Sequence, residues 1–175
     1  MELPQQIENF IEEQIEMDNM TLPWNYPTIE KFDEFQAGYR YNSITKEDLT
    51  EKQGEFHRNW FVICSNYFDD PFFIDITEIE NNFPIYYAQH GAGKWTPIKI
   101  SKSIIEFASQ LRELKNLENN KSAYLKHLQS NFDLENEMWK EVYDSVIEEI
   151  EDEEYNDELQ QSGYGHAGAS ATTGY

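Results

Sequence analysis

The sequence predicts an α+β fold in a single domain, with a mainly antiparallel sheet of about four to six strands packed by helices. Between residues 59 and 107, short apolar runs rich in aromatic and β-branched residues alternate with turn residues. The connections between these runs are too short for the crossover helices of a parallel sheet. The segments on either side place apolar residues at helical spacing, which predicts acidic helices flanking the sheet.

Three of the apolar runs have the length of strands and are too short for helices, namely residues 60–64, 72–76 and 85–88. An Asp-Asp-Pro turn follows the first run, and an Asn-Asn-Phe-Pro break precedes the third. Because both connections have hairpin length, we expect an antiparallel meander. Residues 39–44 alternate weakly and are a further strand candidate, whereas residues 45–59 are predicted to form a loop.

Helices are predicted on both sides of the sheet. Residues 4–18 form an amphipathic pattern, the proline-containing segment 19–27 interrupts it, and a shorter helical segment runs from Thr28 to Gly38. After the sheet, Ser101 is a candidate cap for a helix reaching Leu117 that should lie on the sheet. Residues 122–129 predict a short helix, and Asp133 is a candidate N-cap of the last one.

The C-terminal end carries two further predictions. Nine acidic residues lie between Asp144 and Glu158. Because the C-terminal end of a helix dipole favours cations, we expect the last helix to fray there. We assign residues 1–158 to the single domain. Residues 159–175, built largely from Gly, Ser, Ala and Thr, are predicted to be a disordered tail.

The charge is concentrated at the two ends of the chain. Residues 1–35 hold nine acidic and one basic residue, residues 36–131 hold twelve and eleven, and residues 132–175 hold thirteen and one. The net charge of −21 disfavours binding to nucleic acid or to an anionic membrane surface. An acidic surface can steer a basic protein partner, although acidity also serves solubility alone.

The cysteine count and the N-terminal segment bear on location. Cys64 is the single cysteine, so no intramolecular disulfide can form. The first residues lack the positive charge of a signal peptide, and no apolar run approaches the length of a membrane span. We therefore expect a cytoplasmic protein, and the oligomeric state stays open.

Catalytic and ligand-binding motifs are weak in this sequence, and we predict neither a cofactor nor a metal site nor a catalytic activity. The run Gly91 to Lys94 lacks a Walker motif, because Ala88 stands where glycine is needed and Trp95 where serine or threonine is needed. The four histidines show no zinc-ligand spacing, and Cys64 lies in an apolar run unsuited to an activated thiolate. One enzymatic alternative stays open, a metal-dependent hydrolase built from Asp69, Asp70 and His90.

Surface recognition is the favoured type of site. If the meander is correct, the loops that follow the first and third strands leave the same end of the sheet. These loops bring aromatic and charged residues together, which is typical of protein interfaces. The candidate partner-binding residues are Tyr67, Phe68, Asp69, Asp70, His90, Lys94 and Trp95.

The central block also resembles a known family. The strand DPFFIDI, the segment PIYYAQHGAGKWTP and the helix start ISKSIIEFASQL look like the SUKH superfamily, of the Smi/Knr cell-wall-assembly-regulator type. The likeness covers roughly residues 38–117, and the Leu-Pro, aromatic, Asn-Gly segment of many members has no counterpart near the N-terminus here. The resemblance implies an α+β domain and, in bacteria, most commonly an immunity protein that binds and neutralises a toxin.

The expected function follows from the resemblance and the charge distribution together. We expect a non-catalytic immunity protein that occludes a cognate, basic toxin domain such as a nuclease, as in toxin-antitoxin pairs. A regulatory scaffold for cell-envelope or signalling proteins, which the superfamily's eukaryotic members suggest, is the alternative binding function.

Overall fold

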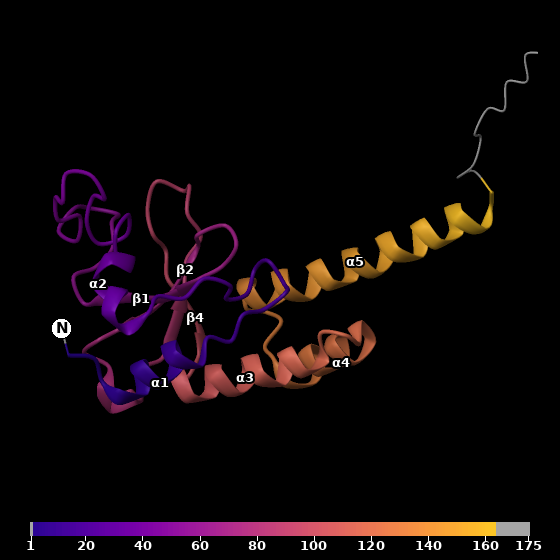
Figure 1. Ribbon diagram of the computed structural model, residues 1–175, viewed down its shortest axis with the longest axis horizontal. Coiled ribbons are helices and arrows are strands. Elements are labelled where there is room, and N and C mark those ends of the chain that lie inside the picture. Colours follow the sequence, from indigo (N-terminus) through magenta and orange to yellow (C-terminus); the bar gives the residue numbers. More distant parts are fainter. Residues whose placement is uncertain (1, 164–175) are drawn as a thin grey trace, which may run out of the picture.

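The computed structural model describes residues 2–163 of the chain. Within them, helices pack against one face of a single sheet (Figure 1). The elements in chain order are α1 (Gln5–Glu13), η1 (Ile29–Lys31), α2 (Phe32–Phe35), β1 (Trp60–Ser65), β2 (Pro71–Asp75), η2 (Ile79–Asn81), β3 (Ile85–Tyr87), β4 (Ile98–Ser101), α3 (Ile104–Leu117), α4 (Lys121–Asn131) and α5 (Glu137–Gln161). Here η marks a short 3-10 helix. The α+β prediction is confirmed.

The sheet is an antiparallel meander in the order β1-β2-β3-β4, as predicted. Its register pairs Phe61 with Ile74 and Phe73 with Tyr86, and a bulge interrupts β1 between Val62 and Cys64. β4 was not predicted from the sequence. Its strand candidate at residues 39–44 was wrong, because this segment makes only isolated bridges within the part of the chain that the structure describes.

Helices cover one face of the sheet and enclose the main core (Figure 1). The ring of Phe107 on α3 stacks between Phe72 of β2 and Phe10 of α1, with ring centroids 5.7 and 5.8 Å apart. The Trp139 indole at the start of α5 donates a hydrogen bond of 2.9 Å to the carbonyl of Ile100. The predicted packing of the helix after the sheet is thereby confirmed, and α5 is tied to the edge strand β4.

The opposite face is covered by an irregular segment, residues 36–58, and not by helices. Phe56 is fully buried there and packs on Phe73, at 4.9 Å between ring centroids. Trp95 meets the Phe56 ring edge-on at 5.6 Å. This second, aromatic core lets a segment without regular secondary structure cover the sheet.

The helix caps differ from two predictions. Ser101 belongs to β4, and Ser103 caps α3 by accepting a hydrogen bond from the Glu106 backbone N–H. Asn136, not Asp133, caps α5, because its side chain accepts from the first backbone N–H groups of that helix. In both cases the cap lies two or three residues beyond the predicted one, where the chain turns into the helix.

The last helix is longer than predicted and leaves the body of the molecule as an arm (Figure 1). It stays helical through the acidic segment to Gln161, so the expected fraying was wrong. Lys121 of α4 offsets part of the repulsion by pairing with Glu149 and Glu153, at 3.2 and 2.6 Å. Of the predicted tail, residues 159–161 belong to α5, and residues 164–175 lie outside the described part.

Among residues 2–163, the structure contains no helix with both the length and the apolar character needed to cross a membrane.

Candidate functional site

The two loops of the predicted site meet at one end of the sheet. The loop after β1 and the loop after β3 leave the same end, because β1 and β3 run in the same direction. Direct contacts join them, since the backbone N–H of His90 donates to Asp70 Oδ1 at 2.9 Å and His90 Nδ1 lies 2.5 Å from the same oxygen. The structure therefore brings these two predicted residues together.

Asp70 is the buried centre of this junction. Its Oδ2 accepts hydrogen bonds from the Tyr87 hydroxyl at 3.1 Å and from Asn66 Nδ2 at 3.3 Å. Burial, and then the neighbouring Asp70 carboxylate, raises the pKa of the Tyr87 hydroxyl above its usual range. Because its oxygens are committed to these donors, Asp70 positions the two loops, whereas the imidazole of His90 is largely exposed.

A groove of about 590 Å³ opens beside the junction. Trp95, His90 and Phe68 line it together with the α2 end and the segment that follows. The Tyr39 hydroxyl donates to the Asp69 carbonyl at 2.7 Å, and burial followed by the nearby Asp69 charge raises the pKa of Tyr39. Predicted residues Phe68, Asp69, His90 and Trp95 thus share one groove.

Lys94 is not among the residues that line this groove. The backbone N–H of its neighbour Trp95 donates to the carbonyl of Gly54 at 2.8 Å. Gly54 has a φ of +82°, and a Cβ there would lie 3.1 Å from Lys94 Cβ. Glycine is therefore needed for the close approach of the two loops, and Lys94 lies against the 36–58 segment.

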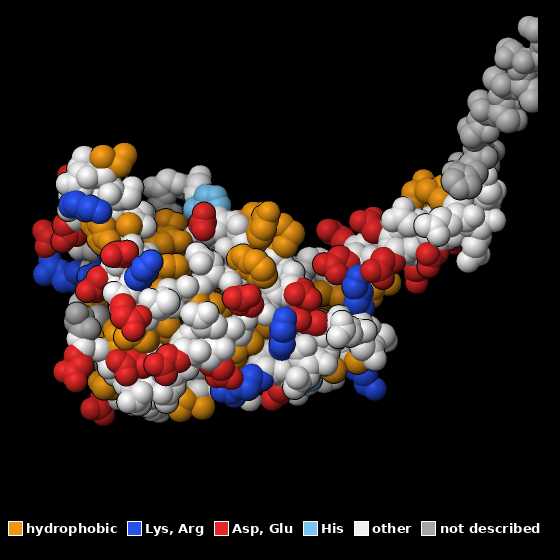
Figure 2. Space-filling view, viewed as in Figure 1, with side chains coloured by type: hydrophobic (Ala, Val, Ile, Leu, Met, Phe, Trp, Pro, Cys, Tyr) orange, Lys and Arg blue, Asp and Glu red, His pale blue; other side chains and the backbone are white. Residues whose placement is uncertain are grey.

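Next to the groove lies an exposed cluster that we call the aromatic patch, defined as Met20, Trp24, Tyr67 and Phe68. Their exposed fractions are 47, 48, 62 and 47 %. The segments that carry them run side by side, because Tyr67 N–H donates to the Met20 carbonyl and Trp24 N–H donates to the Ser65 carbonyl. Hydrophobic side chains gather there on the rim of the body, near the start of α5 (Figure 2).

Sequence reasoning found half of this patch and missed Met20 and Trp24. The available signal was a tryptophan and a methionine in the polar, proline-containing segment 19–27. Such residues need burial or a partner, but the sequence alone does not place that segment beside residues 65–68.

Acidic side chains of α5 border the patch. Glu141 accepts hydrogen bonds from the Gln89 side chain at 3.0 Å and from the Thr21 hydroxyl at 3.4 Å. Asn19 donates to the Ser145 hydroxyl at 2.8 Å, one helical turn further along. The start of α5 therefore lies against both the 19–21 segment and the loop after β3.

The arrangement does not provide the metal site of the hydrolase alternative. Asp70 and His90 are in contact, but Asp69 contributes its backbone carbonyl to Tyr39. Within residues 2–163 no three His, Cys, Asp or Glu side chains are grouped so that they could hold a metal ion. Cys64 is fully buried, which raises the pKa of its thiol and disfavours the reactive thiolate.

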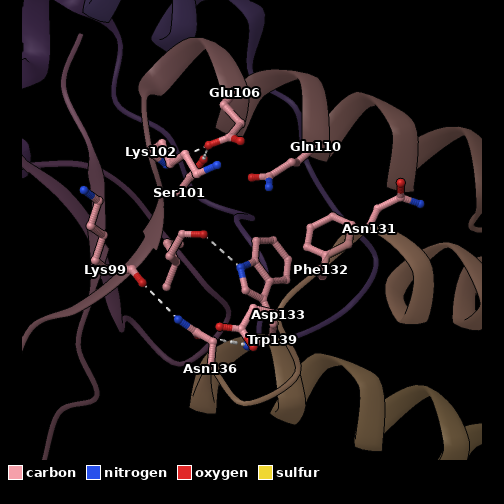
Figure 3. Close-up of a pocket in the computed structure, with 11 residues that line it drawn as sticks. Lys99, Ser101, Lys102, Glu106, Gln110, Asn131, Phe132, Asp133, Asn136 and Trp139 are labelled. Carbon is pink, nitrogen blue, oxygen red and sulfur yellow. Dashed lines mark hydrogen bonds between the residues drawn. The ribbon is translucent and has the colours of Figure 1, made fainter. Parts of the chain in front are cut away.

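A second cavity, of about 350 Å³, lies between β4, α3 and the start of α5 (Figure 3). Its polar groups serve mainly to join these elements. Asn136 Nδ2 donates to the Lys99 carbonyl at 2.9 Å, and Glu106 accepts from the Lys102 backbone N–H at 2.7 Å. In the described part of the chain, Gln110 Oε1 lining this cavity has no hydrogen-bond partner.

None of the protein-family models, curated proteins or solved structures compared with this chain matches it. The resemblance to the SUKH superfamily therefore rests on the strand and turn residues quoted for it.

Proposed function

We propose that this protein is a non-catalytic, cytoplasmic immunity protein that neutralises a cognate toxin domain by binding it and covering its working surface. The observation that carries the proposal is the aromatic patch, an exposed cluster of large side chains at the end of the sheet. Clustered exposed hydrophobic residues mark interaction surfaces in soluble proteins. Trp and Tyr are also the residue types that most often dominate the binding free energy of an interface.

The electrostatics favour a basic partner. The chain carries a net charge of −21, and Glu141 and the acidic α5 arm adjoin the patch. Complementary charge speeds the encounter between two proteins and disfavours wrong partners. Toxin domains that cleave nucleic acid commonly carry basic surfaces, because they bind phosphate. Occlusion requires only this shape and charge complementarity and no reactive group.

The test is protection of cells. The genes beside the gene for this chain are searched for a toxin domain, that domain is expressed together with the chain, and survival is counted. We expect the wild-type chain to restore growth, and the double variant W24A/F68A to lose protection because two central anchors are removed. Ile105→Ala is the control, because Ile105 is also an exposed hydrophobic residue but lies on α3, away from the patch.

Failure of the wild-type chain to protect, together with failure to bind that toxin domain, would rule out the immunity proposal. A chain that instead binds several envelope or signalling proteins weakly through the same patch would be a regulatory scaffold. The two functions are separated by stoichiometry and affinity, since the immunity proposal requires one tight one-to-one complex.

A further inference from the structure

The exposed part of the α5 arm has one side chain stripe that is continuous with the aromatic patch. Residues spaced alternately four and three apart lie along one face of a helix. Starting from Glu141, this spacing gives the set that we call the arm stripe, consisting of Glu141, Ser145, Glu148, Asp152, Tyr155 and Leu159.

The inner end of the arm stripe is fixed next to the patch. Glu141 and Ser145 bond to Thr21 and Asn19, the two residues that flank Met20 of the patch. The stripe therefore starts at the patch and runs outward along the same side of the arm. With a rise of 1.5 Å per residue, the distance from Glu141 to Leu159 along the helix is about 27 Å.

The outer end of the stripe carries two exposed hydrophobic residues in an otherwise polar segment. Tyr155 and Leu159 are 62 and 40 % exposed and lie one turn apart. Figure 2 shows acidic side chains along the arm and hydrophobic side chains near its free end. The pair adds apolar surface at the outer end of the stripe, as the patch does at its inner end.

The acidic residues on the two sides of the arm differ in whether they have a cationic partner. Glu149 and Glu153 face α4 and pair with Lys121. On the stripe, Glu148 and Asp152 have no cation within ion-pair distance among residues 2–163. The stripe thus offers two uncompensated carboxylates between two apolar ends, the patch and the Tyr155–Leu159 pair.

We propose that the aromatic patch and the arm stripe form one docking surface for a protein whose contact face carries basic residues between two apolar contacts. This inference rests on the proposed function and adds to it the surface and the chemistry of the partner. A second copy of this chain does not fit, because two acidic stripes repel each other, and nucleic acid is repelled by the same carboxylates.

The inference is tested with a defined probe and the full chain. The probe is a synthetic helical peptide of about 20 residues, long enough to span the stripe, with two leucines at each end and lysines between them. Binding is measured by calorimetry at low salt, and the contact residues are mapped by NMR amide shifts. We expect shifts at Met20, Tyr67 and along residues 145–159.

Matched variants then separate the stripe from general acidity. Asp152→Lys reverses a charge on the stripe, whereas Glu154→Lys makes the same change on the opposite side of the helix. We expect Asp152→Lys and the double variant Y155S/L159S each to weaken peptide binding about tenfold, which corresponds to about 1.4 kcal/mol. Glu154→Lys should change binding less than about threefold. Circular dichroism of each variant checks that the arm is still helical.

Two results would overturn the inference. One is the absence of peptide binding to the wild-type chain, and the other is equal weakening by Asp152→Lys and Glu154→Lys. Cell protection is scored separately with the toxin domain. A chain that protects cells and shows no preference for the stripe keeps the proposed function and loses this inference, whereas loss of protection by the wild-type chain removes the function itself.

Discussion

At the scale of single residues, Gln36 occupies the unpaired edge of the sheet beside β1. β1 is an edge strand, and fully buried Gln36 bonds its backbone as a neighbouring strand would. Its Oε1 accepts from the Val62 N–H at 2.9 Å, and its Nε2 donates to the Val62 carbonyl at 2.9 Å. One side chain thus satisfies the backbone groups at this point of the edge and blocks further strand pairing there.

Gln36→Leu should destabilise the fold strongly. The variant keeps the volume but leaves both backbone groups of Val62 buried without a partner, at about 1–3 kcal/mol for each group. We expect a loss of about 2–4 kcal/mol in the free energy of unfolding, measured by urea denaturation. Gln53→Leu, at an exposed position, is the control and should change it by less than about 0.5 kcal/mol. A similar effect of both variants would contradict the role given to Gln36.

Substitution of Asp70 should lower the free energy of unfolding more than substitution of His90, because Asp70 is buried and His90 is exposed. Asp70→Ala leaves the buried Tyr87 hydroxyl and Asn66 without their acceptor, so we expect it to cost about 2–4 kcal/mol of unfolding free energy. His90→Ala should cost less than about 1 kcal/mol, because its ring is 58 % exposed. Thermal and urea unfolding of the two variants measure this difference. Equal losses would contradict it and would show that the contact between the His90 ring and Asp70 is the main support of the junction.

The sequence could predict the residues that carry local signals. Asp70 and Trp95 were found because they lie in turns at strand ends. Met20 and Trp24 were missed because their role depends on a bridge between residues 25 and 65, which are far apart in the chain. The burial of Asp70 is likewise a property of tertiary contacts that turn chemistry does not reveal.

At the scale of elements, short apolar runs identified the three central strands, and helical periodicity identified the main helices, although α1 ends at Glu13 and not at Asp18. β4 was missed because it is short, has one exposed lysine and follows a proline, so its pattern is weak. Within the segment 36–58, residues 45–58 were predicted as a loop, but their covering role was not predicted because Phe56 gives no periodic signal on its own. The α5 arm stays helical beyond the point where fraying was predicted, because ion pairs between Lys121 of α4 and the arm compensate part of its charge.

The contact between α1 and α3 should make stability depend on pH. Arg112 Nη2 donates to Glu13 Oε2 at 2.9 Å, and this hydrogen bond lowers the pKa of Glu13 in the folded state. A lowered folded-state pKa stabilises the fold above the unfolded value of about 4.3. That contribution is lost as the pH falls through the folded-state pKa.

Glu13→Gln should therefore be less stable than the wild type at pH 7, by at most about 1 kcal/mol because the pair is partly exposed. The difference should shrink as the pH falls from the unfolded-state value of about 4.3 through the lowered folded-state pKa of Glu13. Urea unfolding at pH 7, 4 and 3 measures it. A difference that is constant over this range would show that the ion pair is not its origin.

At the scale of the whole molecule, the two acidic ends of the chain come together. Residues 1–35 and 132–175 hold most of the net charge, and Asn19 and Thr21 contact Ser145 and Glu141 across more than a hundred residues of sequence. The nearly neutral centre supplies the sheet and half of the aromatic patch. Composition revealed the charge asymmetry, but only the fold shows that both acidic ends border the same exposed surface.

Complex formation should accordingly depend on salt. If the acidic border steers a basic toxin domain, raising the ionic strength from about 0.05 to 0.5 M should slow association, because the Debye length falls below about 5 Å. Dissociation should change less, since it is governed by the desolvated aromatic contacts. Stopped-flow association and dissociation rates measure both. An association rate that does not depend on salt would contradict electrostatic steering by the acidic border.

The strand-end surface should recognise a protein partner, and this is tested by an NMR footprint of the full chain with the toxin domain that the protection experiment identifies. We expect changes in amide chemical shift that are confined to residues 20–24, 66–68 and 89–90 and to the exposed side of α5. Shifts centred instead on the α1–α3 face around Ile105 and Arg112, with the strand-end loops unchanged, would contradict it.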